Sequence, residues 1–331
     1  MRRRVALIGT GGTISSWGRN SLDLTDYELG GPMLQVDELL AKVPEASAVL
    51  DVIPIRFRGI ASNAVKIRDW LDLNALIDRV AAEEKPDGFV VTHGTATLEE
   101  TAYFLNLVAK IDRPIVIVGA QRPPSGLSSD AHMNLYNALR VAASEEARGL
   151  GVLVVLNDEI QAARDVTKTA VYRLEAFHAR ELGLLGYADP DGRIVVYRKP
   201  TRRHAPDTEF DVRGRTELPA VEIVYSYAEA SRAPIDALVA AGVKGIVVAS
   251  LAPGLLPPAQ TAALEDAVRA GIVVVMSCRA GAGRIVGTHA VLSAGFIPAD
   301  NLSPQKARIL TALALIAAKT PADIQRVFEV Y

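Results

Sequence analysis

The chain has 331 residues, of which half are apolar and 22% are charged, and its formal net charge is −2 at pH 7. This length is sufficient for two domains with buried cores, and the near-neutral charge excludes the strongly basic surface typical of nucleic-acid binding. A single cysteine, Cys278, excludes an internal disulfide framework. Because Cys278 follows an apolar run, we predict a small buried core residue there rather than a nucleophile.

The N-terminal segment combines a basic start, at residues 2–4, with an apolar run at residues 5–9. This run is too short for the apolar region of a secretory signal and lacks a small-residue cleavage site. No segment approaches the roughly 18 to 20 consecutive apolar residues of a membrane span. Together with the single cysteine, these features favour a cytoplasmic protein with no membrane partner. They also predict a first buried strand at 5–9.

Short β-branched runs alternate with helical segments along the first part of the chain. Consecutive apolar positions, typical of strands covered on both faces, occur at 5–9, 88–92, 115–119 and 152–156. Helical periodicity occurs between them, at 71–84, 98–108 and 131–143. Strand and helix in alternation predict a doubly wound, mainly parallel sheet, whose ligands bind beyond the carboxyl ends of the strands.

The alternation stops in a charged stretch with several prolines and then resumes. We predict two α/β domains: a larger N-terminal domain at 1–200, a linker at 201–217, and a smaller C-terminal parallel-sheet domain at 218–331. The strands expected in the second domain are 221–224, 245–250 and 272–276. A closing helix is predicted to begin with Ser303 as N-cap and Pro304 in its first turn.

The sequence GTGGTI at residues 9–14 follows the first predicted strand. A dinucleotide-binding motif is excluded there, because its third glycine would fall on Ile14. The glycines allow close backbone approach beyond the strand, and Thr13 projects into that space. Thr13 could equally be a local capping residue in a tight turn, so this stretch alone leaves both interpretations open.

The sequence VTHGTATLEE at residues 91–100 leads from a predicted strand into a helix. Thr97 and Glu100 fit a capping box, so we interpret both as structural. Thr95 is then the residue left pointing at the strand ends. His93 is interpreted as a turn histidine with satisfied hydrogen bonds rather than as a base, because no carboxylate or serine partner is evident nearby.

A lysine in the sequence RDVTKT, at residues 164–169, is the third candidate. A lone lysine such as Lys168 is usually a solvated surface residue. If Lys168 turns toward Thr95, however, its desolvated amine could take the threonine proton. Hydroxyl nucleophiles are weak at their free pKa and need such a partner.

These motifs together resemble the bacterial-type asparaginase family, whose members hydrolyse the side-chain amides of asparagine and glutamine. The motifs that carry the resemblance are GTGGTI (9–14), GFVVTHGTATLEETAYFL (88–105), RPIVIVGAQRP (113–123), NLYNA (134–138), GVLVVLND (151–158), RDVTKT (164–169) and NLSPQKAR (301–308). The resemblance implies a hydrolase of carbon–nitrogen bonds other than peptide bonds, with no metal or organic cofactor. It also implies a homotetramer built from intimate dimers with shared active sites.

By position, the resemblance implies roles for four residues. Thr13 matches the primary nucleophile, and Tyr27 matches the lid tyrosine that assists it. Thr95 and Lys168 match the family's second Thr–Lys pair. The implied reaction is acyl transfer in two steps, in which Thr13 attacks the amide carbonyl, the nitrogen leaves and water hydrolyses the acyl ester. Backbone N–H groups near Thr95 and Ala96 would stabilise the oxyanion.

The substrate-binding positions depart from the family pattern. Ala96 replaces the aspartate that holds the substrate's α-ammonium group in the family. Leu255 replaces an asparagine that reaches the substrate of the neighbouring subunit. The family's Ser-Gln or Ser-Ser pair aligns with Ile60 and Ala61, whereas a shift of one or two residues brings in Ser62 and its neighbour.

These polar-to-apolar changes predict a substrate other than asparagine. An α-ammonium group without its carboxylate partner would be desolvated and unpaired, at a cost of several kcal/mol. We therefore expect an amidohydrolase with a threonine nucleophile that acts on a small amide, lactam or imide lacking the α-amino acid head. The alternatives are an ordinary L-asparaginase in which Ser62, Asn63 or Asp130 rebuilds the clamp, and a catalytically idle homologue that binds a small molecule.

Overall fold

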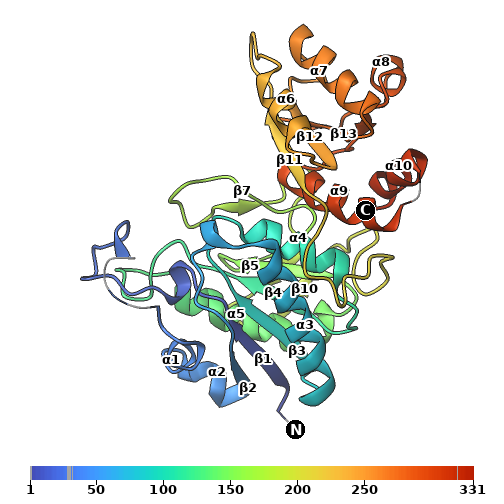
Figure 1. The fold of residues 1–331 in the computed structure, drawn as a ribbon. Helices are drawn as coiled ribbons and strands as arrows, with labels where there is room; N and C mark the ends of the chain where they lie inside the picture. Colours follow the sequence, from blue (N-terminus) through green and yellow to red (C-terminus); the bar gives the residue numbers. More distant parts are fainter. Residues whose placement is uncertain (1, 28–30, 32, 319) are drawn as a thin grey trace. The chain divides into compact units, whose positions relative to one another are not determined.

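The computed structural model describes residues 2–27, 31, 33–318 and 320–331 (Figure 1). Residue contacts divide the chain into two units, Met1–Thr208 and Glu209–Tyr331. Each unit has its own sheet, and the larger sheet is mainly parallel, which confirms the predicted fold class. In the described ranges, no helix is long and apolar enough to cross a membrane.

The first unit is built on a sheet that, in the described part of the chain, has eight strands in the order β10-β9-β6-β5-β4-β3-β1-β2. Their bounds are β1 (Arg4–Gly9), β2 (Asp51–Arg56), β3 (Gly88–Thr92), β4 (Ile115–Val118), β5 (Val152–Leu156), β6 (Glu159–Ala162), β9 (Gly186–Ala188) and β10 (Ile194–Val196). β2, β1, β3, β4 and β5 are parallel, whereas β6, β9 and β10 add antiparallel pairs at one side. A separate hairpin pairs β7 (Thr167–Lys168) with β8 (Phe177–His178).

Helices cover both faces of this sheet. The helices on one face are α1 (Val36–Leu40), α2 (Pro44–Val49) and α5 (Ala131–Ala143), and those on the other are α3 (Ile67–Glu83) and α4 (Leu98–Val108). Short 3-10 turns occur at Thr13–Ser15, Ser62–Ala64 and Glu145–Ala147. Cover on both faces explains why the central strands are apolar at consecutive positions rather than at alternate ones.

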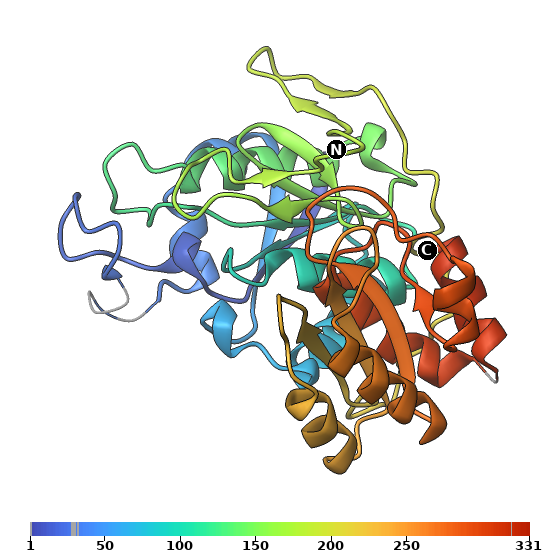
Figure 2. The same ribbon diagram turned by 90° about the horizontal axis from the view of Figure 1, so that it is seen from above.

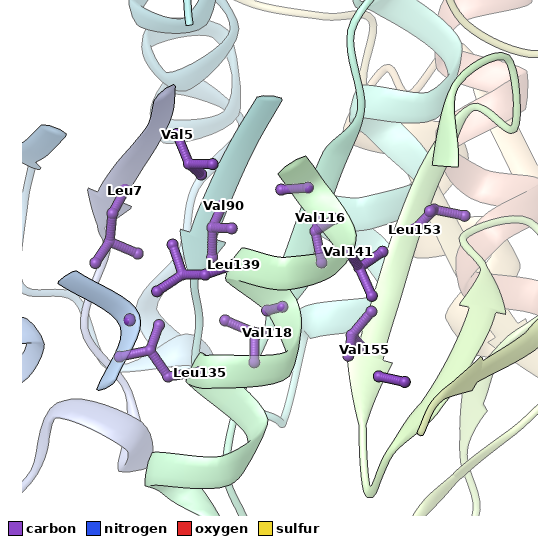
Figure 3. Close-up of a cluster of buried hydrophobic side chains, with 14 of the residues drawn as sticks. Val5, Leu7, Val90, Val116, Val118, Leu135, Leu139, Val141, Leu153 and Val155 are labelled. Carbon is purple, nitrogen blue, oxygen red and sulfur yellow. The ribbon is translucent and has the colours of Figure 1, made fainter. Parts of the chain in front are cut away.

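Figure 3 shows the core between α5 and one face of the sheet. Leu135 and Leu139 of α5 belong to the same buried cluster as Val5, Leu7 and Val90 from the strands. The intervening residues of β1 are equally buried and face the opposite layer of helices. The central strands are therefore held from both sides, which gives the residues that follow them a rigid base.

The second unit is coloured from yellow to red in Figures 1 and 2. In the described residues it has a smaller four-stranded parallel sheet with the order β11-β12-β13-β14. Its elements are β11 (Val221–Tyr225), α6 (Ala233–Ala240), β12 (Gly245–Ser250), α7 (Pro258–Arg269), β13 (Val273–Cys278), α8 (His289–Ser293), β14 (Ile297–Pro298), α9 (Pro304–Ala317) and α10 (Pro321–Val330). α6 and α7 share a buried cluster with one face of the sheet, and α9 packs against β11, β12 and β13. Ser303 is the N-cap of α9 and Pro304 opens the helix, as predicted, although α10 follows it.

The segment 201–217, expected as a linker, is held by both units. Ala205 N donates to Asn106 O, and Thr208 Oγ1 donates to Leu107 O, within the first unit. From Glu209 onward the contacts lie in the second unit, where Glu209 N donates to Tyr331 Oη. The change from one unit to the other thus occurs between residues 208 and 209.

Two local predictions need correction. Thr97 is the N-cap of α4, but its side chain makes no capping bond; its Oγ1 instead donates to Ser62 O at 2.7 Å. The predicted capping box with Glu100 is therefore wrong, because a tertiary partner takes the hydroxyl. Cys278 ends β13 and is only partly buried, packing against the core cluster of the second unit, so it is not the fully buried residue that was expected.

Candidate active site

Two threonines lie beyond the carboxyl ends of adjacent parallel strands. Gly9, the last residue of β1, pairs with Thr92, the last residue of β3, and Thr13 and Thr95 follow a few residues later. The strand order reverses at this pair, because β1 has β2 on one side and β3 on the other. Such a reversal leaves a crevice outside the strand ends, where doubly wound sheets bind their ligands.

Gly12 and Gly94 allow the two strand exits to touch. Gly12 has a φ of +86°, and a Cβ built on it would overlap the backbone of Gly94. A Cβ on Gly94 would lie 2.6 Å from Ser62 Oγ and 3.1 Å from Gly12 Cα. Gly12 and Gly94 are therefore required by backbone contact between the two exits, which brings the two threonines to one place.

Thr13 has a tyrosine partner. Thr13 Oγ1 and Tyr27 Oη are 2.7 Å apart, and either oxygen can donate the hydrogen bond. The segment before Tyr27 is held by Asp23, whose carboxylate accepts hydrogen bonds from Arg19 N and Asp26 N. Hydrogen bonds from Arg19 hold the pKa of Asp23 below its usual value, so this carboxylate stays ionised near neutral pH.

Thr95 has a lysine partner. Lys168 Nζ donates to Thr95 Oγ1 at 2.7 Å, and Lys168 N donates to Glu99 Oε2 at 3.0 Å. Burial lowers the pKa of Lys168, although the nearby Glu99 carboxylate opposes this effect. A lysine with a lowered pKa has a larger neutral fraction, and only the neutral amine can accept a proton from a hydroxyl.

Both pairs open onto one cavity of about 270 Å³ within the first unit. Its lining residues are Gly12, Thr13, Leu24, Thr25, Tyr27, Ala61, Ser62, Asn63, Thr95, Ala96, Gln121, Lys168, Val171 and Tyr172. The four residues expected to act in catalysis are thus brought together. Among the described lining residues there is no aspartate or glutamate.

The expected substrate-binding residues separate into two groups. Ala61, Ser62 and Ala96 line the cavity, whereas Ile60 does not and donates its backbone N–H to Thr10 O. Leu255 lies in the second unit, where its side chain is 61% exposed.

The 3-10 turn Ser62–Ala64 places the shifted pair, Ser62 and Asn63, at the cavity. Ser62 Oγ accepts a hydrogen bond from Ala96 N at 3.2 Å. This backbone N–H was expected to stabilise an oxyanion, but here its partner is the serine. Asp130, the other residue considered for the clamp, is not among the lining residues, because its carboxylate accepts from Gln121 N and Arg122 N.

His93 is a satisfied turn histidine, as predicted. Its Nδ1 lies 2.8 Å from Gly94 O, and its Nε2 lies 2.9 Å from Thr101 Oγ1. Trp70 Nε1 donates to the same Thr101 hydroxyl at 2.7 Å. Burial lowers the pKa of His93 to about 4, so the ring is neutral at physiological pH.

Five further lining residues were not singled out from the sequence: Leu24, Thr25, Gln121, Val171 and Tyr172. Gln121 follows the end of β4, so its place after a central strand was a usable signal. Leu24, Val171 and Tyr172 lie in connecting segments with no motif that marks them. In the described residues, no group of three or more His, Cys, Asp or Glu side chains is placed to hold a metal ion.

Comparison with known proteins gives the family. The model described as "Asparaginase, N-terminal" matches residues 4–202, and that described as "Glutaminase/Asparaginase C-terminal domain" matches residues 220–328. The chain belongs to the asparaginase family. It is therefore an amidohydrolase, a hydrolase acting on carbon–nitrogen bonds other than peptide bonds, and enzymes of this family act on small amide substrates.

Individual members of the asparaginase family match along almost their whole length. L-asparaginase 2 of Bacillus subtilis (strain 168) is 40% identical over 327 residues, covering 99% of this chain and 86% of that protein. Glutaminase-asparaginase of Pseudomonas fluorescens biotype A is 39% identical over 330 residues, covering 99% of this chain and 90% of that protein. The crystal structure of a probable cytoplasmic L-asparaginase from Campylobacter jejuni matches with a TM-score of 0.95 and 39% identity, covering 100% of both chains.

Proposed function

We propose that this asparaginase-family enzyme hydrolyses L-asparagine to L-aspartate and ammonia, with Thr13 as the nucleophile. The observation that carries the proposal is the convergence of the Thr13–Tyr27 and Lys168–Thr95 pairs on one cavity. Relatives named L-asparaginase and glutaminase-asparaginase, each about 40% identical, support asparagine as the first substrate to test.

The two pairs suit the two halves of an acyl transfer. In the first half, Thr13 Oγ1 bonds to the amide carbon, and Tyr27 Oη relays a proton: it accepts the hydroxyl proton across 2.7 Å while it gives up its own phenolic proton. That proton goes to the nitrogen as the carbon–nitrogen bond breaks, and ammonia leaves. In the second half, water attacks the acyl ester and gives a proton toward the Thr95–Lys168 pair. The ester bond then breaks, the acid leaves, and the proton held by the pair returns to Thr13 Oγ1 to restore its hydroxyl.

Polar groups at the cavity fit an amino-acid substrate in part. Ser62, Asn63 and Gln121 offer a hydroxyl and two carboxamides that can hold an α-carboxylate or an α-ammonium group. This supports the alternative in which Ser62 and Asn63 rebuild the clamp, and it weakens the expectation of a wholly different substrate. Asp130 contributes nothing to this clamp, since its carboxylate is engaged elsewhere.

The test is ammonia release from L-asparagine by the wild type, Thr13→Val and a matched control, Thr201→Val, at an exposed threonine away from the cavity. The isosteric Thr13→Val change removes only the hydroxyl, so we expect kcat to fall by about 10³-fold or more. The control should retain wild-type kinetics. Full activity in Thr13→Val would refute Thr13 as the nucleophile, and no turnover of asparagine by the wild type would refute the substrate.

A second candidate is hydrolysis of an amide, lactam or imide that lacks the α-amino acid head. It is favoured by one observation: the described lining residues include no carboxylate to pair with an ammonium group, and Ala96 stands at the cavity. Measuring turnover of simple primary amides, lactams and imides beside asparagine distinguishes the two. A homotetramer with shared active sites and a cytoplasmic location stay predictions.

A further inference from the structure

The connection between β7 and β8 forms one side of the cavity mouth. Lys168, in β7, directs its Nζ to Thr95, and Val171 and Tyr172 line the same cavity a few residues later. The side chains of Val171 and Tyr172 are 72% and 73% exposed. Because these two apolar side chains are exposed at the cavity, a substrate can contact them, whereas it cannot contact buried core residues.

This connection is anchored to rigid elements at its base. Lys168 N donates to Glu99 Oε2 in α4, and Thr169 N donates to Ala176 O across the hairpin at 2.6 Å. The base of the hairpin is therefore fixed to the helix that follows Thr95. A contact at the tip is needed to fix Tyr172 as well, because Tyr172 lies three positions beyond Thr169.

Gln121 supplies the contact at the tip. Its Nε2 donates to Arg173 O at 2.9 Å and to Val171 O at 3.4 Å, so both neighbours of Tyr172 are held through their carbonyl groups. Gln121 is fixed in turn, since its backbone N donates to Asp130 Oδ2 at 2.9 Å. Tyr172 is thus held at the cavity by a residue that follows a central strand, rather than lying on a free loop.

The described lining of the cavity includes both polar and apolar side chains. The polar ones include Thr13, Tyr27, Ser62, Asn63, Thr95 and Lys168, among which we expect the amide to react. Leu24, Val171 and Tyr172 add large apolar side chains from two separate segments of the chain. A substrate whose amide lies at the polar side chains can place the rest of its carbon skeleton against the apolar ones, where burial of apolar surface favours binding.

We propose that Tyr172 is a specificity-determining residue, positioned by Gln121, that favours amides with an apolar or aromatic group beyond the reacting carbonyl. This inference rests on the proposed hydrolysis of amides at Thr13 and belongs with the second candidate function, in which the substrate lacks the charged α-amino acid head. It concerns the part of the substrate beyond the reacting carbonyl, whose recognition the two catalytic pairs do not explain.

The experiment compares propionamide with 3-phenylpropanamide, which share the reacting amide and differ by a phenyl ring. The wild type should have a higher kcat/KM for 3-phenylpropanamide. Tyr172→Ala should lower that preference by about tenfold, the size of effect expected from a lost apolar contact in a specificity pocket. Tyr172→Phe should keep it, because the ring and not the hydroxyl makes the contact. Tyr197→Ala, at a tyrosine that is 71% exposed and outside the cavity lining, is the matched control.

Gln121→Met tests the positioning role, because it keeps the side-chain length and removes both N–H donors. We expect the preference to fall as in Tyr172→Ala with little change in melting temperature. A loss of stability with the preference intact would show that Gln121 is only structural and would overturn that part of the proposal. A wild type with no preference for the phenyl amide, or a Tyr172→Ala variant that retains it, would overturn the role of Tyr172.

Binding measurements separate this inference from the proposed function. In the Thr13→Val background, calorimetry gives the affinity for both amides without turnover. If Tyr172→Ala weakens binding of 3-phenylpropanamide about tenfold while the parent enzyme hydrolyses no amide, the proposed function fails and the inference stands. If Thr13→Val abolishes hydrolysis while Tyr172→Ala alters neither binding nor preference, the inference fails and the function stands.

Discussion

The pKa of the Lys168 amine depends on two opposing features of its surroundings. Burial disfavours its charged form, whereas the Glu99 carboxylate favours it, and the net effect lowers the pKa. Because the proposed mechanism uses the neutral amine, activity should be lost as the pH falls through this pKa. We therefore expect Lys168 and Glu99 to set the acid limb of the pH dependence of kcat.

Glu99→Gln should shift the acid limb of the kcat profile to lower pH. The amide can still accept the hydrogen bond from Lys168 N, but it no longer stabilises the ammonium form, so the pKa of Lys168 falls further. The measurement is kcat against pH for the wild type and the variant, with Glu100→Gln in the same helical turn as control. A shift to higher pH, or none, would contradict the proposed role of the neutral amine.

Ala96 permits a direct test of substrate selection. It is exposed at the cavity beside Ser62, so a carboxylate there would stay solvated and cost little folding free energy. Ala96→Asp should raise kcat/KM for L-asparagine at least about tenfold, equivalent to about 1.4 kcal/mol, by pairing with the α-ammonium group. Ala96→Asn, of the same size but uncharged, is the control. If the two variants behave alike, charge at this position does not select the substrate.

At the scale of elements, the segments that follow β1 and β3 hold each other in position. Their separation is set by backbone contact between Gly12 and Gly94, and each exit carries one of the two threonines. The sheet fixes the strands, but the distance between the two pairs depends on these glycines. A side chain at Gly94 would displace Ser62 and Gly12 together.

Gly94→Ala should reduce both activity and stability. The added Cβ would lie 2.6 Å from Ser62 Oγ and 3.1 Å from Gly12 Cα, so the turn at Ser62 and the exit at Gly12 must shift, and overpacking of this kind costs about 1 to 3 kcal/mol of unfolding free energy. We expect kcat/KM to fall about 100-fold, because a displacement of about 1 Å in a reacting group has that effect. Gly59→Ala, whose Cβ would approach no atom closer than 3.8 Å, is the control. Lower stability with unchanged kcat/KM would show that the contact does not position the threonines.

The parts of the fold that were predicted share a physical cause. Strands buried on both faces leave continuous apolar runs, and these identified the centres of both sheets. β2 was missed because it is an edge strand with exposed residues and a proline, Pro54, and therefore has no such run. β9 and β10 are too short for a periodic signal.

The threonines at the strand ends could be predicted from the sequence pattern, whereas Tyr27 and Lys168 were assigned from the family resemblance. Thr13 and Thr95 follow central strands, so their convergence could be anticipated from topology. The choice between Ile60 and Ser62 depended on a register that the sequence left open, and the turn Ser62–Ala64 decides which side chains reach the cavity. Tyr172 depends on a side-chain contact from Gln121, which has no local pattern in the sequence.

At the scale of the whole molecule, the prediction that Leu255 reaches the substrate of a neighbouring subunit can be tested by complementation. Leu255→Arg and Thr13→Val should each be nearly inactive, the first because a long cation replaces a substrate contact and the second because it lacks the hydroxyl. If sites are shared, a mixed dimer contains one site with both native residues and one with neither. Random pairing of equal amounts then restores roughly a quarter of the wild-type sites.

The control for this experiment is Leu292→Arg, at a leucine of the second unit that is 53% exposed and has no predicted role. It should be active alone and should leave the activity of a Thr13→Val mixture proportional to its own share. Differently tagged subunits establish by co-purification that mixed oligomers form. Mixed oligomers of Leu255→Arg and Thr13→Val without restored activity would show that each site is completed within one chain, and would overturn the prediction that Leu255 reaches the substrate of a neighbouring subunit.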